Sequence, residues 1–260
     1  MRILVTFAVE AEFAPWRKLR RFTPQSAAGL ALWKATTSNC DIFVLLTGIG
    51  ERSGSNSMDL LMRFATVDRY FDVCISSGLA GALDVRHKVG EVLAARSLRA
   101  HTVHADLKSD RLVNDSELIE LAVSCGAKSV EAFYTAERVA TTAREKAEFA
   151  PFADAVDMES FEVLKEANAW GARGIAVRAI SDGADADLPL DFNRTINSSN
   201  RVSIPRVIVE LAKRPSALPG LIEFGRHSRK AAELLASFLD AYVLRIGQTA
   251  RVQTNEKVAV

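Results

Sequence analysis

A chain of 260 residues that is 48% hydrophobic and 25% charged has the composition of a globular enzyme with a large core. Its formal net charge of +1 excludes the basic excess of a typical nucleic-acid-binding protein. No apolar run reaches the roughly 18 residues of a membrane helix, and Met1 to Ala8 is too short for a signal peptide. We therefore expect a cytoplasmic protein with no membrane span and no nucleic-acid partner.

Short apolar runs alternate with segments of helical periodicity along the chain. The first pair is a strand at residues 3–8 and a helix at residues 10–20. Further strands are expected at residues 30–36, 41–47, 71–76, 89–95, within 129–139, at 155–158 and at 174–180. Further helices are expected around residues 58–65 and at 117–125, 143–149, 159–170, 202–211 and 218–242.

This alternation, with strands that are almost continuously apolar, predicts a three-layer α/β/α fold around a central mixed sheet. We expect one domain over residues 1–246. The last residues, 247–260, lack periodicity and are expected to form a flexible tail. The polar segment at residues 185–200 is expected to be a long loop, of the kind that often acts as a lid.

Acidic and glycine-rich segments fall at the expected carboxyl ends of five strands. Ligands bind beside such ends in sheets of this kind, so we expect these segments to share one crevice. They are Glu10–Glu12, Gly48–Gly50, Gly78–Gly81, Met158–Glu159 and Ser181–Asp182.

Each acid also has a purely structural interpretation. Glu12 opens a helix, where it complements the helix dipole, and Asp182 precedes a glycine, where it can form a turn. Together, however, acids in one crevice suit glycosidic cleavage, which uses one acid on the leaving group and one base on water. Asp182 suits protonation of a purine ring nitrogen, and Glu12 suits the water.

The remaining reactive side chains indicate no metal site. His101 and His104 are three residues apart, but no nearby ligand completes a zinc set. The three cysteines, Cys40, Cys74 and Cys125, have no paired spacing and are expected to be free thiols. We expect neither a metal nor an organic cofactor.

Four motifs of the sequence resemble those of the nucleoside phosphorylase/nucleosidase superfamily. Val5 to Phe13 resembles the opening strand and acidic helix start of methylthioadenosine/S-adenosylhomocysteine nucleosidases, and Thr47 to Gly50 resembles their second glycine turn. Ser77 to Gly81 resembles their glycine-rich strand end. Val156 to Ser160, followed by Ala176 to Asp182, matches the superfamily's Met-Glu turn and its terminal Ser-Asp signature. The motifs occur in family order over about residues 1–245.

The resemblance implies a role for each matching residue. Glu12 would activate water, and Asp182 would protonate purine N7. Glu159 would bind the ribose hydroxyls with Met158 beneath the sugar. Ser181 and Arg178 would hold Asp182, and Phe192 would cover the 5′ substituent, although it could equally be a loop anchor. The remaining substrate-binding positions that it implies are Ile49, Gly78, Leu79, Arg138 and Val139.

Two departures from the family pattern bear on the nucleophile and the base. Ser76 and Leu79 stand where phosphorylases carry an Arg and a Ser for phosphate, so Arg52 or Arg86 would have to supply the missing cation. This favours water over phosphate. Arg138 and Val139 occupy the stretch where the family supplies an aromatic stack for the base. Glu137 to Thr142 also resembles the hopanoid-associated branch, which is implicated in removing adenine from an adenosyl-lipid.

Three hypotheses follow. The first is a nucleosidase that cleaves a 5′-substituted adenine nucleoside with water. The second is a purine or uridine phosphorylase that uses phosphate. The third is a nucleoside-binding protein without catalysis. The resemblance also implies a homodimer, for which an apolar helix such as Leu60 to Phe64 could serve.

Overall fold

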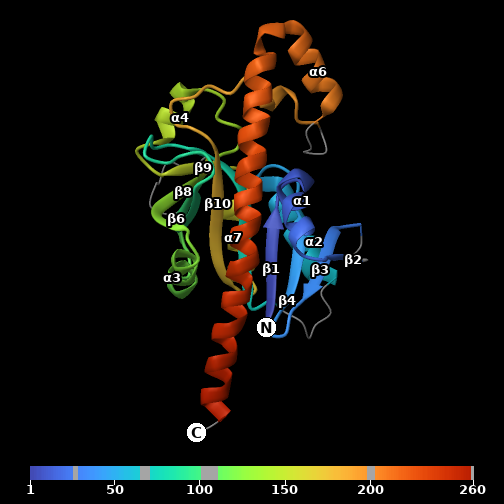
Figure 1. Ribbon diagram of the computed structural model, residues 1–260, viewed down its shortest axis with the longest axis vertical. Coiled ribbons are helices and arrows are strands. Elements are labelled where there is room, and N and C mark those ends of the chain that lie inside the picture. The colour runs from blue at the N-terminus through green and yellow to red at the C-terminus, as the bar shows by residue number, and fades with distance from the viewer. Residues whose placement is uncertain (26–28, 65–70, 101–110, 198–202, 259–260) are drawn as a thin grey trace.

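The computed structural model describes residues 1–25, 29–64, 71–100, 111–197 and 203–258. Its centre is a mixed sheet with helices on both faces (Figure 1), as the sequence predicts. The strands are β1 (Arg2–Phe7), β2 (Thr23–Gln25), β3 (Ala31–Thr36), β4 (Asp41–Leu46), β5 (Val73–Ala82), β6 (Val92–Ala100), β7 (Arg111–Val113), β8 (Lys128–Thr135), β9 (Ala155–Asp157) and β10 (Arg173–Asp182). The helices are α1 (Glu10–Leu19), α2 (Glu51–Phe64), α3 (Ser116–Ser124), α4 (Ala143–Phe149), α5 (Ser160–Ala169), α6 (Ile204–Lys213) and α7 (Leu218–Val258), with short 3₁₀ helices η1 (Phe192–Arg194) and η2 (Pro215–Ala217).

The sheet has an open wing and a closed part. In the wing, β1 lies between β4 and β5 and is parallel to both, and the edge beyond β4 is formed by β3 and β2. On its other side β5 pairs with β10, and β10 continues through β6, β8 and β9 back to β5. Five strands therefore close on themselves, so one end of this ring can hold a cavity. The short edge strands β2 and β7 were not predicted from the sequence.

Strand β5 is longer than predicted. The sequence places Gly78–Gly81 beyond the end of a strand, but these residues continue β5 because β10 pairs with all of them on one side, and β9 pairs with Gly81 on the other. Strand β9 is antiparallel to β5, with Val156 opposite Gly81. The chain after β9 therefore runs back along β5, which brings Met158 and Glu159 toward Gly78. The site is thus built from strand interiors as well as strand ends.

Two apolar cores fill the space between the sheet and its helices. On one face, α1, α3 and α7 bury side chains such as Phe13, Leu118 and Leu239 against β1, β5 and β10. On the other face, α2 and α5 bury Met58 and Leu164. Burying side chains of this size contributes about 1.5–3 kcal/mol each, so the two cores fix the strand positions.

Helix α7 runs the length of the molecule and extends beyond the sheet at both ends (Figure 1). Asp240 fastens it to α1, because its Oδ1 accepts hydrogen bonds from Trp16 Nε1 at 3.0 Å and Arg20 Nε at 2.7 Å. The backbone is helical to Val258, past the point where the sequence loses its periodicity. The flexibility of residues 247–260 and the domain boundary at 246 stay predictions.

Several sequence expectations concern the loop and the surface. The described part of the expected long loop, residues 185–197, contains only η1 as a helix. His101 and His104 lie outside the described residues. Among the residues described, no group of three or more His, Cys, Asp or Glu could hold a metal ion. No helix in the described ranges is long and apolar enough to cross a membrane.

Candidate functional site

A cavity of about 630 Å³ lies at the end of β5 and β10, beneath η1 and the first turns of α7. Its lining is mostly apolar, and the polar side chains are concentrated in a few positions. Ten of the predicted site residues line it: Glu12, Ile49, Leu79, Arg138, Val139, Met158, Glu159, Ser181, Asp182 and Phe192. Gly78 and Arg178 do not line it and lie next to residues that do. The acids from distant parts of the chain therefore share one cavity, whereas their roles stay predictions.

Glu12 is held by three backbone N–H groups. Its Oε2 accepts hydrogen bonds from Ala8 and Val9 at 3.0 and 3.2 Å, and its Oε1 accepts one from Leu79 at 2.9 Å. The first two come from the turn that opens α1, and the third comes from β5. Burial raises the pKa of Glu12, while these three donors and the nearby Arg178 oppose that rise. The result is a buried carboxyl whose position is fixed by backbone.

Gly78 makes room for that carboxyl. Its φ is +142°, and a Cβ at this position would lie 2.9 Å from Glu12 Oε1 and 3.0 Å from Arg178 Nη1. Both the backbone conformation and the crowding therefore require glycine. The absence of a side chain at Gly78 therefore allows Glu12 and Arg178 to occupy their observed positions.

Glu159 faces the same cavity at the start of α5. Its Oε1 accepts the backbone N–H of Gly50 at 2.9 Å, and its Oε2 lies 3.8 Å from Arg178 Nη2. Burial raises the pKa of Glu159 to about 8 against the attraction of Arg178, and the negative charges of Asp157 and Glu12 add to the rise. Glu159 is therefore largely protonated at neutral pH when the cavity is empty. Such a carboxyl can both donate to and accept from a diol.

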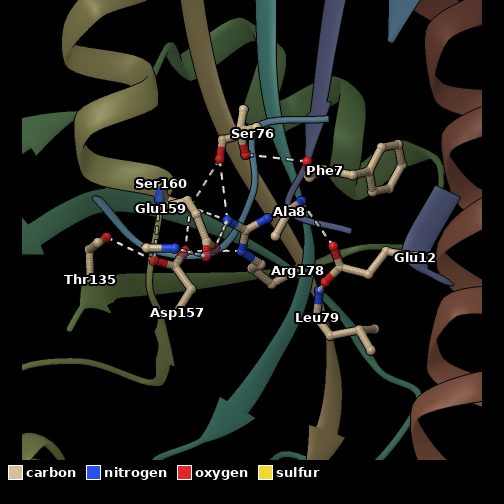
Figure 2. A network of polar contacts seen from close by, with 12 residues as sticks. Phe7, Ala8, Glu12, Ser76, Leu79, Thr135, Asp157, Glu159, Ser160 and Arg178 are labelled. Atoms are coloured by element: carbon tan, nitrogen blue, oxygen red, sulfur yellow. Dashed lines mark hydrogen bonds and ion pairs between the residues drawn. The ribbon is translucent and has the colours of Figure 1, made fainter. Parts of the chain in front are cut away.

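Arg178 does not hold Asp182, so that prediction is wrong. Its guanidinium is buried among other polar groups (Figure 2): Nε donates to Asp157 Oδ2 at 3.0 Å, and Nη2 donates to Ser160 Oγ at 2.9 Å and to Ser76 Oγ at 3.3 Å. The reason is a bulge in β10. Ile180 pairs with Ala80, but Asp182 already pairs with Gly81, so one extra residue lies between them. A bulge of one residue turns the following side chain to the opposite face of the strand.

Asp182 is held instead by Ser181 and by a residue that the sequence did not reveal. Ser181 Oγ lies 2.6 Å from Asp182 Oδ1, which agrees with the expected contact. Lys146 Nζ lies 2.6 Å from Asp182 Oδ2, and the lysine side chain is only 1% exposed. Lys146 belongs to α4, a short helix rich in charged residues, where a lysine ordinarily faces solvent. No motif in the sequence marks it.

Apolar side chains form the outer wall. Phe192 of η1 stacks obliquely on Phe224 of α7, with ring centroids 5.2 Å apart, and both line the cavity. Asn193 fastens this wall to Val139, because its Oδ1 accepts the Val139 N–H at 2.9 Å and its Nδ2 donates to the Val139 carbonyl at 3.0 Å. Arg138 Nη1 pairs with Glu145 at 2.5 Å, so its guanidinium is directed toward α4.

The described cations of the cavity wall are engaged elsewhere. Arg138 pairs with Glu145, and Arg229 pairs with Glu233 at 3.0 Å. Arg86 pairs with Asp84 at 2.6 Å, is 77% exposed and does not line the cavity, so it is not placed to supply the cation that phosphate would need there. The side chain of Arg52 lies outside the described residues.

Comparison with known proteins places the whole arrangement in a family. The sequence pattern of the phosphorylase superfamily (PNP_UDP_1) matches residues 2–243. The chain belongs to the phosphorylase superfamily. It is therefore an enzyme of the group that contains the nucleoside phosphorylases and nucleosidases, and its members act on nucleosides.

A superfamily relative of defined activity is the 5′-methylthioadenosine/S-adenosylhomocysteine nucleosidase of Glaesserella parasuis serovar 5 (strain SH0165). It is 25% identical over 185 residues, which cover 64% of this chain and 78% of the relative. A futalosine hydrolase mutant of Helicobacter pylori strain 26695 has the same fold, with a TM-score of 0.70, 20% identity, and 94% and 98% of the two chains covered.

A second solved structure is the Neisseria meningitidis 5′-methylthioadenosine/S-adenosylhomocysteine nucleosidase in complex with methylthio-immucillin-A. Its TM-score is 0.68 at 20% identity, with 93% of this chain and 98% of that chain covered. At this level of identity the solved structures show a shared fold. The resemblance to the hopanoid-associated branch stays a prediction.

Proposed function

We propose that this protein hydrolyses the N-glycosidic bond of a 5′-substituted adenine nucleoside. The observation that carries the proposal is the convergence of Glu12, Glu159 and Asp182 on one cavity of about 630 Å³. That volume suits a nucleoside, because small-molecule sites usually measure about 300–1,000 Å³. The acids come from α1, the turn after β9 and the end of β10, so no single local structural role accounts for all three.

The proposed mechanism divides the work among these acids. Glu12 accepts a proton from water, whose oxygen bonds to C1′ as the bond to the base breaks. Asp182 delivers a proton to the purine, which leaves as a neutral base. Glu159 binds the ribose hydroxyls, and Met158 packs beside it. Cleavage of this kind passes through a sugar cation, which the ionised carboxylate of Glu12 stabilises.

Water is the favoured nucleophile because the described cavity wall offers no free cation for phosphate. A phosphate dianion needs cations or several converging donors. The side chain of Leu79 supplies no hydrogen bond, and its backbone N–H already donates to Glu12. Arg178 is close, but its guanidinium is buried behind the wall, where it bonds Asp157 and Ser160. The carboxylate of Glu12, which must be ionised to act as the base, would also repel a phosphate placed beside it.

The 5′ substituent is proposed to lie against the apolar outer wall. Phe192, Phe224, Leu188 and Ile196 line this part of the cavity. They offer dispersion contacts and no charge, which suits a thioether or a longer apolar group. The cytoplasmic location and the homodimer remain proposals, and sedimentation analysis of the purified protein tests the second.

A nucleoside panel tests the reaction. Adenosine, 5′-methylthioadenosine, S-adenosylhomocysteine, inosine and uridine are incubated with and without phosphate, and the released base and the sugar product are measured. We expect adenine release that is independent of phosphate, with a free sugar as the product. A requirement for phosphate, with ribose 1-phosphate as the product, would establish the phosphorylase instead. Tight binding without turnover at any pH would establish a binding protein.

Two variants test the assigned roles on the best substrate. Glu12→Gln and Asp182→Asn are each expected to lower kcat by about 10²–10⁴-fold, the usual contribution of general acid or base catalysis. Glu10→Gln is the matched control, because Glu10 lies on the same helix with a side chain 46% exposed and paired with Arg17. Full hydrolysis by Glu12→Gln would refute its role as the base.

A further inference from the structure

Lys146 is a buried lysine whose N–H groups all have partners in the site. Its Nζ lies 2.6 Å from Asp182 Oδ2, and it donates to the carbonyls of Gly183 at 2.7 Å and Ala186 at 2.9 Å. An ammonium has three protons, so these three acceptors use all of them. Burying an ammonium is costly unless every proton is paired, so the arrangement is specific rather than incidental.

Gly81 leaves space for the ion pair between Lys146 and Asp182. A Cβ at Gly81 would lie 3.0 Å from Asp182 Oδ2 and 3.6 Å from Lys146 Cε. Helix α4, which carries Lys146, is fixed by a capping box in which Thr142 and Glu145 bond each other's backbone. Helix α4 thus positions Lys146, strand β10 positions Asp182, and Gly81 lies beside both side chains.

Asp182 accepts hydrogen bonds on both of its carboxylate oxygens, so the proton that it would give to the purine must come from another group. Asp182 receives the Lys146 ammonium on Oδ2, and the Ser181 hydroxyl lies beside Oδ1. Both oxygens are therefore placed as acceptors, and Asp182 must gain a proton before it can pass one to a purine. The Lys146 ammonium and the Ser181 hydroxyl both lie at 2.6 Å, but Lys146 is the better source, because an ammonium releases a proton far more readily than an aliphatic hydroxyl.

We propose that Lys146 is a positioning residue that supplies, through Asp182, the proton taken up by the leaving base. This inference rests on the proposed function. The proton moves from Nζ to Oδ2, and Asp182 passes a proton to the base nitrogen as the glycosidic electron pair moves onto the base. Water gives its hydroxyl to C1′ and its proton to Glu12, which releases that proton to solvent. Lys146 regains a proton from solvent through Asp182 once the base has left.

The carbonyl contacts fit both states of the lysine. A neutral amine has two N–H groups, and the carbonyls of Gly183 and Ala186 are two acceptors in place for them. The lone pair of the amine then faces the acid proton of Asp182. Transfer therefore breaks no hydrogen bond, and exclusion of water by the substrate favours the uncharged pair over the ion pair.

The test compares two leaving groups on the same sugar. An adenine nucleoside needs a proton on its base, whereas 4-nitrophenyl riboside releases a stable anion without one. Lys146→Met is expected to lower kcat on the adenine nucleoside on the order of 10²-fold with little change in KM. Its kcat on the nitrophenyl riboside should stay within a small factor of wild type. Lys165→Met is the control, because Lys165 is 57% exposed on α5.

Lys146→Arg distinguishes the effect of the positive charge of Lys146 from its ability to release a proton. Arginine keeps a positive charge but does not release a proton at working pH, so we expect it to lose activity on the adenine nucleoside as well. Wild-type activity in Lys146→Arg would overturn the inference, and so would equal losses on both substrates in Lys146→Met. If Lys146→Met does not fold, or if the wild type does not cleave the nitrophenyl riboside, the inference is tested by the activity of Lys146→Arg on the adenine nucleoside. Failure of the wild type on every nucleoside would instead overturn the proposed function, and this inference with it.

Discussion

Leu79 donates its backbone N–H to Oε1 of Glu12 at 2.9 Å. The contact joins the middle of β5 to the first turn of α1, and it does not depend on the side chain at position 79. Any residue other than proline at this position would keep the backbone donor in place. The side chain of Leu79 lines the cavity and makes this part of its wall apolar.

Gly78→Ala is expected to disturb the site far more than the fold. The new Cβ would lie 2.9 Å from Glu12 Oε1 and 3.0 Å from Arg178 Nη1, so one of these two groups must move. Because 1 Å of misplacement can reduce a rate about 10²-fold, we expect a loss of that order in kcat. Steady-state kinetics on the best nucleoside measures it.

Gly126→Ala is the matched control for Gly78→Ala. Gly126 also has a positive φ, of +103°, but nothing lies within 4 Å of its added Cβ. Both variants should lose about 1–3 kcal/mol of unfolding free energy from backbone strain, measured by urea denaturation. Only Gly78→Ala should lose activity. Equal activity in the two variants would show that the crowding at Glu12 has no effect on the reaction.

Glu159 makes the stability of the protein depend on pH. Burial raises its pKa to about 8 from an ordinary value of 4.5. Below pH 4.5 both the folded and the unfolded protein hold the proton, and between pH 4.5 and 8 the unfolded protein loses it first. The folded protein therefore loses stability as pH rises through this window, by about 1.4 kcal/mol for each pH unit. Above pH 8 the effect is constant.

Glu159→Gln removes this titration. Its melting temperature should therefore rise relative to that of the wild type as pH increases from 5 to 8, and the difference should then level off. Scanning calorimetry at pH 5, 6.5, 8 and 9 measures it. Glu162→Gln is the control from helix α5, because Glu162 is partly exposed and paired with Lys165, and it should follow the wild type at every pH. A constant difference between wild type and Glu159→Gln would mean that Glu159 titrates normally.

The order of strands and helices could be predicted from the sequence because apolar periodicity directly reflects burial. The same applies to the acids of the cavity, which the sequence places at the expected ends of apolar strands. Glu12, Glu159 and Asp182 were found in this way, and all three line the cavity. Periodicity could not show whether neighbouring strands run parallel or antiparallel. Strand β9 is antiparallel to β5, and this pairing brings Glu159 back toward Gly78.

The partners of Asp182 show a second limit. A single extra residue in β10 turns Asp182 away from Arg178 and toward Lys146, which lies 36 residues earlier in the chain. A bulge leaves no signature in the sequence of an apolar strand. Without it, the regular alternation of a strand would put Arg178 and Asp182 on one face, which is what the sequence suggested. Local pattern thus identified the acid but not the residues that hold it.

Asn193→Ala is expected to weaken substrate binding more than it slows the reaction. Its side chain makes both hydrogen bonds between η1 and Val139, at 2.9 and 3.0 Å. Without them the wall carrying Phe192 is less firmly held, while the cavity acids are untouched. KM should rise several-fold, the equivalent of about 1 kcal/mol for a lost hydrogen bond, with kcat little changed. Arg194→Ala is the control, because its side chain is 65% exposed. A fall in kcat alone would contradict this division of roles.

Arg178 and Asp157 are expected to be strongly coupled. Their side chains are 2% and 1% exposed and meet at 3.0 Å, so removing either charge leaves the other buried without its partner. Arg178→Met and Asp157→Asn should each cost about 3–5 kcal/mol of unfolding free energy. The double variant should cost clearly less than the sum of the two, because it leaves neither charge alone. Urea denaturation of the four proteins in a double-mutant cycle measures the coupling. Additive losses would contradict the coupling and would leave the other partners of Arg178 Nη2, which are Ser76, Ser160 and Glu159, to account for its effect.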